Sequence, residues 1–478
     1  MSAGITEEQY DIAIIGGGCA GALAAVQLAR ACRENAWRPL LKVAVVDESA
    51  RPARGVAYST QFIEHLLNVS AKGMSAFPEE PNHFADWLKK RMPESRAETF
   101  APRKIYGDYI EELLKAALTS TSIELRLIAE RALSISGDTD STQSIQLASG
   151  QRLRAEIVIL APGNFPPERS KFAASLAERT DRFHDNPWAV DLCQQVSTND
   201  DVLLIGTGLT MIDVVLQLRA TGHRGRYHAV SRHGYLPQEH YDYDSLAQEQ
   251  PTQYLTIPEN ASLTAACKAM LNAARTAERQ ETGKWRCVMS ELRGCTSRVW
   301  SQLNLADRRR FLRHVRQLWE VHRHRMAPEI AAHLHELQQE GLLDVAAGRI
   351  LKIAPEANGL HVSYRARGDG ERSLHVAHAI NCTGPETDFR AVAHPLIAAL
   401  RKDGVLLPDE LGLGANVDES GAAINSRGQA SRRLYTIGSI RKGNLWESTA
   451  VPEIRAQAHA VVQTALKNLS TTSTGAAS

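Results

Sequence analysis

The amino-acid sequence predicts an α/β fold of two similar units with a helical insert, and three observations support this prediction. Two segments, opening at Tyr10 and near Asp201, each run from an apolar strand through a glycine-rich turn into a helix. Short apolar strands follow both segments, as in parallel sheets that are buried on both faces. Between about Gln238 and Gly341 the pattern is instead polar and helical. The chain of 478 residues is long enough for two or three domains.

The first segment predicts a dinucleotide-binding site. Its turn carries Gly16, Gly18 and Gly21 in the pattern G-x-G-x-x-G. The first glycine permits a sharp turn, the second lets a pyrophosphate approach the backbone, and the third lets helix and strand pack closely. The helix amino terminus then offers free N–H groups to the phosphates. The next strand ends at Asp47, where an acid accepts hydrogen bonds from a ribose, so the segment reads as a Rossmann-like unit.

The second segment repeats this arrangement with two changes. Gly206 and Gly208 occupy the first two glycine positions, but Met211 replaces the third. The following strand ends at Ser231 and Arg232 instead of an acid. An arginine there attracts a 2′-phosphate that an acid would repel, which favours NADPH over NADH.

The rest of the chain supplies loops, the insert and a closing unit. Residues 51–109 read as loops with short helices, because glycine and proline punctuate them. The segment from Phe311 to Trp319 carries apolar residues at helical spacing, which predicts one amphipathic helix with a basic outer face. The insert is either a solvated cap or a lid that recognises substrate. The last strand and the helix from about Val451 look like the completion of the first unit, so one unit is inserted into the other.

Composition narrows the possible partners. The net charge of +1 argues against nucleic acid or an anionic membrane as a partner. No apolar run is long enough to span a membrane, and the acidic start lacks a signal peptide, so we expect a cytoplasmic protein. Seven scattered cysteines without C-x-x-C predict buried thiols, and no metal site is expected. The sequence does not predict the oligomeric state.

Several motifs point to a family. The set R-G-V-A-Y-S-T, L-N-V-S-A, H-R-H-R-x-A-P, N-C-T-G-P and W-E-S-T-A-V-P-E-I-R resembles bacterial FAD/NAD(P)-binding proteins of the YdhS-like group. The layout is distantly similar to class B flavin monooxygenases, including N-hydroxylating and Baeyer–Villiger enzymes. The resemblance implies an FAD domain interrupted by an NADPH domain. The expected boundaries are 1–170 and 381–470 for the FAD domain, 171–237 and 342–380 for the NAD(P)H domain, 238–341 for the insert or cap, and 471–478 for a disordered tail.

The resemblance also implies which residues contact the cofactors. The expected FAD contacts are Gly16, Gly18, Cys19, Ala20, Gly21, Asp47, Glu48, Asn68, Val69, Met74, Gly163, Gly438, Trp446 and Ser448. The expected NADPH contacts are Gly206, Gly208, Leu209, Thr210, Ser231 and Arg232. Substrate candidates are Lys72, Arg103 and Tyr106. A structural salt bridge is an equal alternative for Arg103, and helix capping is one for the segment at Trp446 and Ser448.

These features predict an FAD-dependent, NADPH-using monooxygenase. Such an enzyme acts through a flavin hydroperoxide, with dioxygen, on a small substrate that carries a nucleophilic amine or sulfur. The cofactor supplies this chemistry, so no catalytic side chain is assigned. One alternative is a flavin-dependent NAD(P)H reductase or dehydrogenase, although the missing C-x-x-C argues against its disulfide-reductase branch. Another alternative is a redox-sensing regulatory protein.

Overall fold

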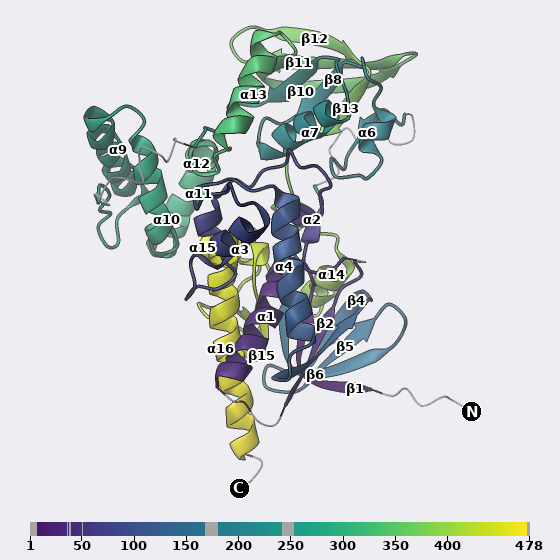
Figure 1. Ribbon diagram of the computed structural model, residues 1–478, viewed down its shortest axis with the longest axis vertical. Coiled ribbons are helices and arrows are strands. Elements are labelled where there is room, and N and C mark those ends of the chain that lie inside the picture. The colour runs from purple at the N-terminus through teal and green to yellow at the C-terminus, as the bar shows by residue number, and fades with distance from the viewer. Residues whose placement is uncertain are drawn as a thin grey trace.

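Two sheets follow one another along the long axis of the molecule, and a bundle of helices lies beside them (Figure 1). The computed structural model describes residues 7–35, 37, 40–49, 51–167, 180–240 and 253–475. Both sheets are mainly parallel and are covered by helices, as expected for an α/β fold of two Rossmann-like units. The predicted fold class is confirmed.

The first sheet draws strands from both ends of the chain. Its central order is β14-β15-β6-β1-β2-β3, and the hairpin of β4 and β5 joins it at β6. Strand β15 pairs in parallel with β6, so the carboxy-terminal segment completes the sheet that the amino-terminal segment begins. The strands are β1 (Glu8–Ile15), β2 (Leu41–Val46), β3 (Ile123–Ile128), β4 (Ala132–Ser136), β5 (Gln143–Leu147), β6 (Arg152–Leu160), β14 (Ala422–Ile424) and β15 (Ala430–Thr436).

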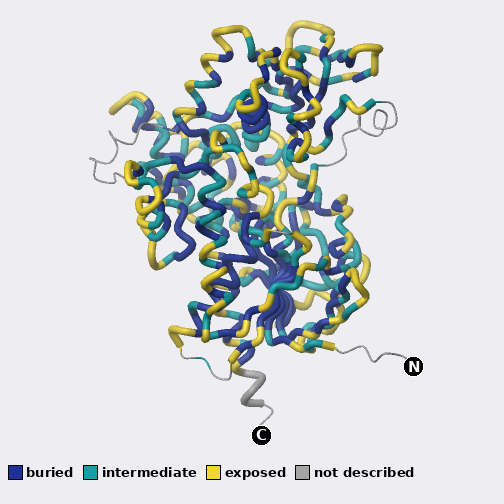
Figure 2. Tube along the Cα trace, turned by 45° about the vertical axis from the view of Figure 1, so that its right-hand side comes forward, coloured by how far each residue is buried: buried dark blue, intermediate teal, exposed yellow. Residues whose placement is uncertain are grey.

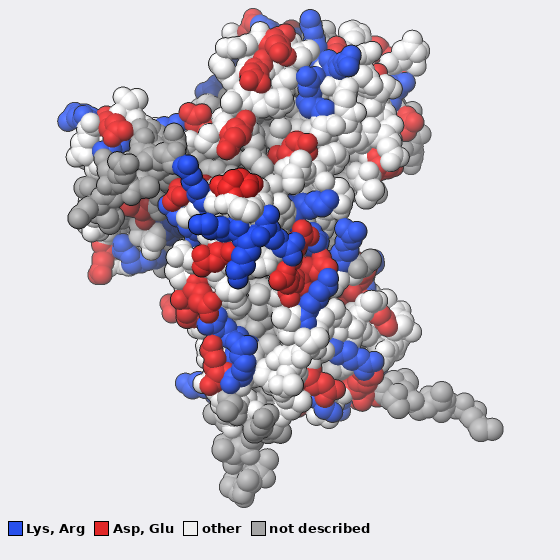
Figure 3. All heavy atoms as spheres, viewed as in Figure 1, with Lys and Arg blue, Asp and Glu red and all other residues white. Residues whose placement is uncertain are grey.

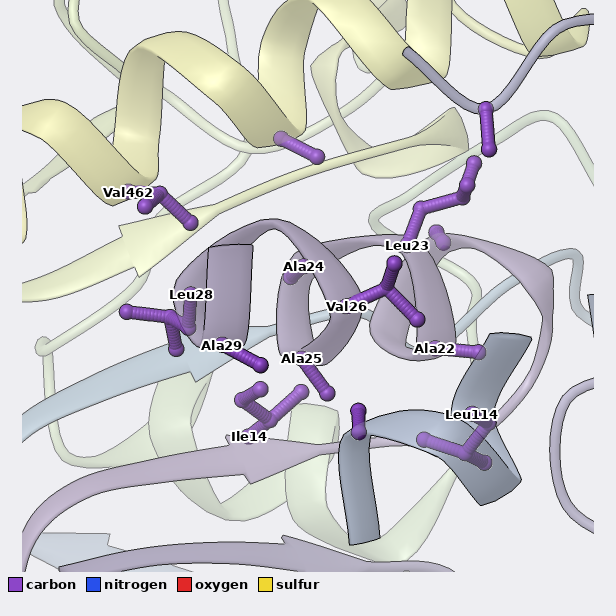
Figure 4. Packing of buried hydrophobic residues seen from close by; sticks show 14 of the residues in the cluster. Ile14, Ala22, Leu23, Ala24, Ala25, Val26, Leu28, Ala29, Leu114 and Val462 are labelled. Atoms are coloured by element: carbon purple, nitrogen blue, oxygen red, sulfur yellow. The ribbon is translucent and has the colours of Figure 1, made fainter. Parts of the chain in front are cut away.

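Three long helices, α1 (Cys19–Glu34), α4 (Arg103–Leu118) and α16 (Val451–Gly475), pack on this sheet. Apolar side chains such as Ile14, Leu28 and Val462 join them in one core (Figure 4), which is the dark, buried centre in Figure 2. Helix α14 (Pro395–Lys402) packs beside β4. The shorter helices are α2 (Gly55–Tyr58), η1 (Ala71–Gly73) and α3 (His83–Arg91).

The end of α16 corrects one expectation. A disordered tail was predicted from residue 471, but α16 continues to Gly475. Threonine and serine have only modestly lower helix propensity than alanine, so a helix that is already packed can extend through them. Residues 476–478 lie outside the described part of the chain.

The second sheet has the order β12-β11-β10-β9-β8-β13-β7. Helices α7 (Leu209–Ala220) and α13 (Pro328–Gln339) share a core with its central strands. A short helix, α6 (Leu192–Gln195), precedes β8. The strands are β7 (Phe183–His184), β8 (Val202–Ile205), β9 (Tyr227–Ser231), β10 (Leu343–Glu356), β11 (Gly359–Ala366), β12 (Glu371–Val376) and β13 (His378–Asn381).

The insert consists of α9 (Leu263–Gln280), α10 (Trp285–Gln302), α11 (Leu305–His314) and α12 (Arg316–Arg323). The structure divides the single amphipathic helix expected through Phe311 and Trp319 into α11 and α12, which meet at Val315, so that expectation is wrong. Both aromatic side chains join one cluster across this point. Helix α10 contacts the short helix α15 (Lys442–Leu445), which follows η2 (Ser439–Arg441).

Candidate functional site

The first glycine-rich turn has the geometry of a phosphate site. A Cβ at Gly21 would collide with the Gly16 carbonyl oxygen, so packing alone requires that glycine. Gly18 is different, because a Cβ there would meet nothing closer than the Cα of Gly55 at 3.5 Å. Gly18 caps α1 without a side-chain hydrogen bond, which leaves the helix's first N–H groups available. An FAD pyrophosphate would satisfy those donors, and Cys19 and Ala20 lie at this helix start.

The carboxylate of Asp47, at the end of β2, is hydrogen-bonded to the glycine-rich turn. Asp47 accepts hydrogen bonds from the Gly17 N–H at 2.6 Å and from the Ser49 N–H at 2.7 Å. Glu48 points away and forms an exposed ion pair with Arg131. Asp47 therefore lies at the turn, and Glu48 is held elsewhere.

The segment around α2 also covers this turn, which sequence reasoning missed. The Ala53 N–H donates to the Gly17 oxygen at 2.6 Å, and Gly55 approaches Gly18. Ala53 has a φ of 82°, an uncommon conformation for a residue other than glycine. In the sequence, the only indication of this contact is the R-G-V-A-Y-S-T motif, which follows shortly after Asp47 at the end of β2.

In the second glycine-rich turn, close packing requires a glycine at position 206 but leaves open space beside Gly208. Gly206 has a φ of 116°, and a Cβ there would lie 2.6 Å from the Cys382 oxygen. No described protein atom lies within 4 Å of the Cβ position at Gly208, which precedes Leu209 and Thr210 at the uncapped start of α7. The missing third glycine is explained by Met211, which is fully buried in the adjacent core.

At the end of β9, the side chain of Arg232 is accessible. The Ser231 hydroxyl lies 2.9 Å from the Thr207 hydroxyl and accepts a hydrogen bond from the Gly234 N–H at 3.0 Å. Arg232 is exposed, and no described acid forms an ion pair with it. Its guanidinium is therefore available to a 2′-phosphate at this turn.

A shallow pocket joins the two sheets where their strands end. Asn164, after β6, and Pro385, after β13, both line it together with Ser439 and Thr449. The Ser439 hydroxyl donates to the Gly163 oxygen, which ties the last β-strand turn to the β6 turn. Gly438 has a φ of 88°, and its N–H donates to the Gln457 side chain at 2.8 Å, so this turn is also tied to α16. We call this space the strand-end pocket.

A second pocket, which shares Lys442 and Thr449 with the first, is lined by charged side chains. Its other walls include Asn68, Val69, Trp446 and Ser448. We call it the ionic pocket, after its charged residues Arg293, Glu320, Arg323, His324, Lys442, Glu447 and Glu453. These residues come from α10, α12, α15 and α16 and from the segments that follow α12 and α15, so the insert and the carboxy-terminal unit build the pocket together.

Close ion pairs hold the charged groups of the ionic pocket. Arg293 binds Glu453 through two contacts, at 2.5 and 2.8 Å. Arg323 donates one hydrogen bond to Glu447, with Nη2–Oε2 at 2.8 Å, and its Nε lies 2.7 Å from Oε1 without hydrogen-bond geometry. A two-pronged pair such as that of Arg293 and Glu453 fixes both side chains in one orientation. The pocket therefore presents acids and bases at defined positions.

The pKa values of four groups in the ionic pocket are shifted, and these groups are Arg293, Glu320, Lys442 and Glu453. Burial lowers the pKa of the Lys442 ammonium, although Glu320 opposes the shift from 4.0 Å. Burial by itself would raise the pKa of Glu320, but the hydrogen bond from His324 and the charges of Lys442 and Arg316 prevail and lower it. Lys442 is therefore a partly buried cation beside a carboxylate that keeps its charge.

Two features of the segment between α15 and α16 mark it as a ligand wall. Trp446 has a φ of 62°, and the Glu447 N–H donates to the Leu445 oxygen at 2.8 Å, which forms a strained γ-turn. The buried Ser448 hydroxyl has no hydrogen-bond partner in the described part of the chain. A flavin at this wall would give that hydroxyl a partner, so these residues fit FAD.

The three substrate candidates lie outside the ionic pocket. Tyr106 is fully buried and packs against Tyr58 with the rings tilted by 60° and their centroids 4.8 Å apart. Arg103 forms an ion pair with Asp213 at 2.6 Å. This contact is a structural salt bridge, the alternative to substrate binding for this residue. Lys72 pairs with Glu98 at the surface.

The loop residue Met74 is buried in the first core. Its neighbours Asn68 and Val69 line the ionic pocket, and contact of these three residues with the flavin stays a prediction. Sequence reasoning missed Arg323, His324 and Glu453, although the motif H-R-H-R contains the first two and W-E-S-T-A-V-P-E contains the third.

Other kinds of site find no support in the described residues. No described helix is both long and apolar enough to cross a membrane. No three His, Cys, Asp or Glu side chains gather to hold a metal ion in the described ranges. Charges of both signs are interspersed over the face in Figure 3, in line with the balanced composition.

Comparison with known proteins agrees with this geometry. Residues 13–165 match a family described as FAD-NAD(P)-binding. No curated protein sequence matches the chain significantly.

Solved structures share the fold over nearly the whole length. L-lysine 6-monooxygenase from Pseudomonas syringae has a TM-score of 0.67 at 15% identity, covering 96% of this chain and 99% of that one. The ornithine N-hydroxylase of Kutzneria sp. 744, with reduced FAD, NADP⁺ and L-ornithine, has a TM-score of 0.64 at 13% identity and the same coverage. Bacillithiol disulfide reductase from Staphylococcus aureus, also at that coverage, has a TM-score of 0.56 at 13% identity. The chain therefore has the fold of two-nucleotide flavoenzymes.

Proposed function

We propose that the protein is an FAD- and NADPH-dependent monooxygenase that transfers one oxygen atom to the amine nitrogen of a small molecule. One observation carries the proposal: the ionic pocket adjoins the strand-end pocket, where turns of both nucleotide units meet. A substrate in the ionic pocket would thus lie next to both cofactors. The exposed Arg232 supports NADPH as the electron donor.

Bound FAD would take hydride from NADPH and activate dioxygen. The overall reaction balances as amine, O₂, NADPH and H⁺ giving hydroxylamine, H₂O and NADP⁺. The chain's own task is to bind the amine and orient it, and the amine must lose its ammonium proton because only the neutral nitrogen is nucleophilic. Glu447 and Glu453 would hold the ammonium, next to Lys442 in the same pocket.

The fold alone does not separate oxygenases from reductases, since amine hydroxylases and a disulfide reductase share it. The pocket favours the oxygenase. Disulfide exchange needs an accessible thiolate, but Cys382 is buried and Cys19 is only partly exposed, and burial raises the pKa of both thiols. None of the ionic-pocket residues is a cysteine.

The proposal is tested by measuring the stoichiometry of the reaction. FAD-loaded protein is given NADPH and a panel of primary amines, and NADPH oxidation, oxygen uptake, peroxide and product are measured together. We expect one hydroxylamine for each NADPH and each O₂ consumed with an accepted amine. Reduction of FAD by NADPH with all oxygen recovered as peroxide, for every amine, contradicts the proposal.

A variant pair tests the role of the pocket. Glu447→Gln removes a charge that pairs with Arg323, whereas Glu98→Gln removes a surface acid that pairs with Lys72. We expect the first to raise the KM for the amine at least tenfold and the second to leave it unchanged. Equal KM values for both variants contradict the assignment of the ionic pocket.

A further inference from the structure

The helical insert contains an apolar cavity among its four helices. Its walls include Leu263, Met270, Val299, Phe311, Trp319 and Trp446. The one hydroxyl in the lining, on Thr296, donates to the Leu292 oxygen at 2.7 Å and so presents no unpaired polar group. The cavity has a volume of about 60 Å³, several times the roughly 10–15 Å³ that one water requires. A cavity with such walls favours an apolar occupant over water. We call it the insert cavity.

Trp446 lines both the insert cavity and the ionic pocket. The Lys442 ammonium lies 4.9 Å from its ring centroid, on the side of the ionic pocket's charges. Within the insert, the rings of Trp300 and Phe311 lie 5.0 and 4.9 Å away. One indole therefore separates a charged space from an apolar one.

The surrounding structure holds the Trp446 indole in place although its backbone is strained. The γ-turn at Trp446 is strained, and such a conformation persists only where its surroundings impose it. The Trp300 Nε1–H donates to the Gly443 oxygen at 2.8 Å and ties α10 to the segment that carries Trp446. Strain held at a wall between two pockets indicates that the wall is functional.

A second indole adds an unused donor. Trp319 lines the insert cavity, and its buried Nε1 has no acceptor among the described residues. A buried donor without a partner is destabilising, and an oxygen on an occupant would relieve this. Glu320, the next residue, lines the ionic pocket, so α12 also contributes to both spaces.

We infer that the insert cavity binds an apolar group of the substrate, so that the substrate is an amphiphilic amine. Its charged end lies in the ionic pocket, and its alkyl or aryl end extends along Trp446 into the cavity. The inference rests on the proposed function, because it assigns the second half of the same substrate. It gives the insert a role in selecting the substrate by length and hydrophobicity.

The test measures binding without turnover. FAD-loaded protein, without NADPH, is titrated calorimetrically with linear primary amines from propylamine to octylamine. Each methylene that enters the cavity should tighten binding about fourfold, until the cavity is full and the affinity stops rising. Affinity that does not depend on chain length overturns the inference.

Adjacent alanines of α9 provide matched variants. Ala266 lines the cavity, whereas Ala265 is exposed on the same helix. Ala266→Leu fills the cavity and should abolish the dependence on chain length, while Ala265→Leu should keep it. Met270→Ala enlarges the cavity and should move the optimum to longer amines, which tests the inference even if Ala266→Leu does not fold. Wild-type profiles for both cavity variants overturn it.

The two proposals fail differently. A length dependence that Ala266→Leu abolishes, without any oxygenated product, contradicts the monooxygenase and supports the cavity as a ligand site. Product formation with binding that ignores chain length contradicts the insert cavity alone.

Discussion

Gly206 and Gly208 stand two residues apart, yet only the first is required by the protein's own packing. A side chain at Gly206 would strain the backbone and meet the Cys382 oxygen, whereas Gly208 has a φ of −88° and open space around it. We expect Gly206→Ala to destabilise the fold by about 1–3 kcal/mol. Gly208→Ala should keep the melting temperature but weaken NADPH binding at least tenfold, because its methyl group blocks the phosphate. Wild-type NADPH affinity in Gly208→Ala, measured by fluorescence titration, contradicts the second nucleotide site.

Ser448 allows a similar separation of stability from binding at the first cofactor. Its hydroxyl is buried without a partner among the described residues, so Ser448→Ala should leave the apoprotein as stable or up to about 1 kcal/mol more stable. The same change should weaken FAD binding, since the flavin loses a hydrogen bond. Apoprotein melting and FAD titration check both parts. Unchanged FAD affinity would show that the hydroxyl does not face the flavin.

Residues with local signatures could be predicted from sequence, and residues assembled from distant segments could not. The glycines of both turns are recognised because strand, turn and helix are contiguous. Arg323 and Glu447 are 124 residues apart, and Arg293 and Glu453 are 160 apart, so no spacing rule joins them. Arg103 was ambiguous for the same reason, because its partner Asp213 is 110 residues away.

At the scale of elements, the Arg103–Asp213 ion pair connects α4 of the first unit to α7 of the second. The Arg103 and Asp213 side chains are only 14% and 4% exposed, so each would be left as a buried charge without the other. Asp213→Asn should therefore destabilise the protein by about 3 kcal/mol in urea unfolding. The double variant Arg103→Met with Asp213→Leu should lose much less, because it leaves no unpaired charge. Equal losses in the single and double variants contradict this account of the contact.

His240, just before the insert, joins it to the loop at Asn68, whose oxygen lies 3.0 Å from Nε2. Burial lowers the pKa of His240 to about 3, whereas a histidine in the unfolded chain titrates near about 6.5. Below about pH 6.5 the unfolded state binds the proton first, so stability present above this pH is lost as the pH falls.

The contribution of His240 to this loss is about 2 kcal/mol between pH 6.5 and 5. His240→Gln, which can keep the hydrogen bond, should reduce the loss by that amount in urea unfolding at the two pH values. His335→Gln, on the exposed face of α13, serves as the control. Identical pH profiles for wild type and His240→Gln contradict the buried, neutral state of this histidine.

Across the whole molecule, the order of elements was more predictable than their ends. The completion of the first sheet by the carboxy-terminal strand follows from its strand, turn and helix pattern, and β15 does pair with β6. The division of the helix at Val315 accompanies aromatic packing between distant residues, which a local pattern does not contain. The contact of the insert with α15, which builds the ionic pocket, is likewise a product of packing.

Labelling with isotopic dioxygen tests the central claim most directly. FAD-loaded protein, NADPH and an accepted amine are incubated under labelled dioxygen, and the product is analysed by mass spectrometry. Oxygen transfer to the amine predicts one labelled oxygen atom in the product, with the amine nitrogen as its site. A product without label, or full recovery of the label in peroxide and water while the amine is unchanged, would contradict the assignment as a monooxygenase.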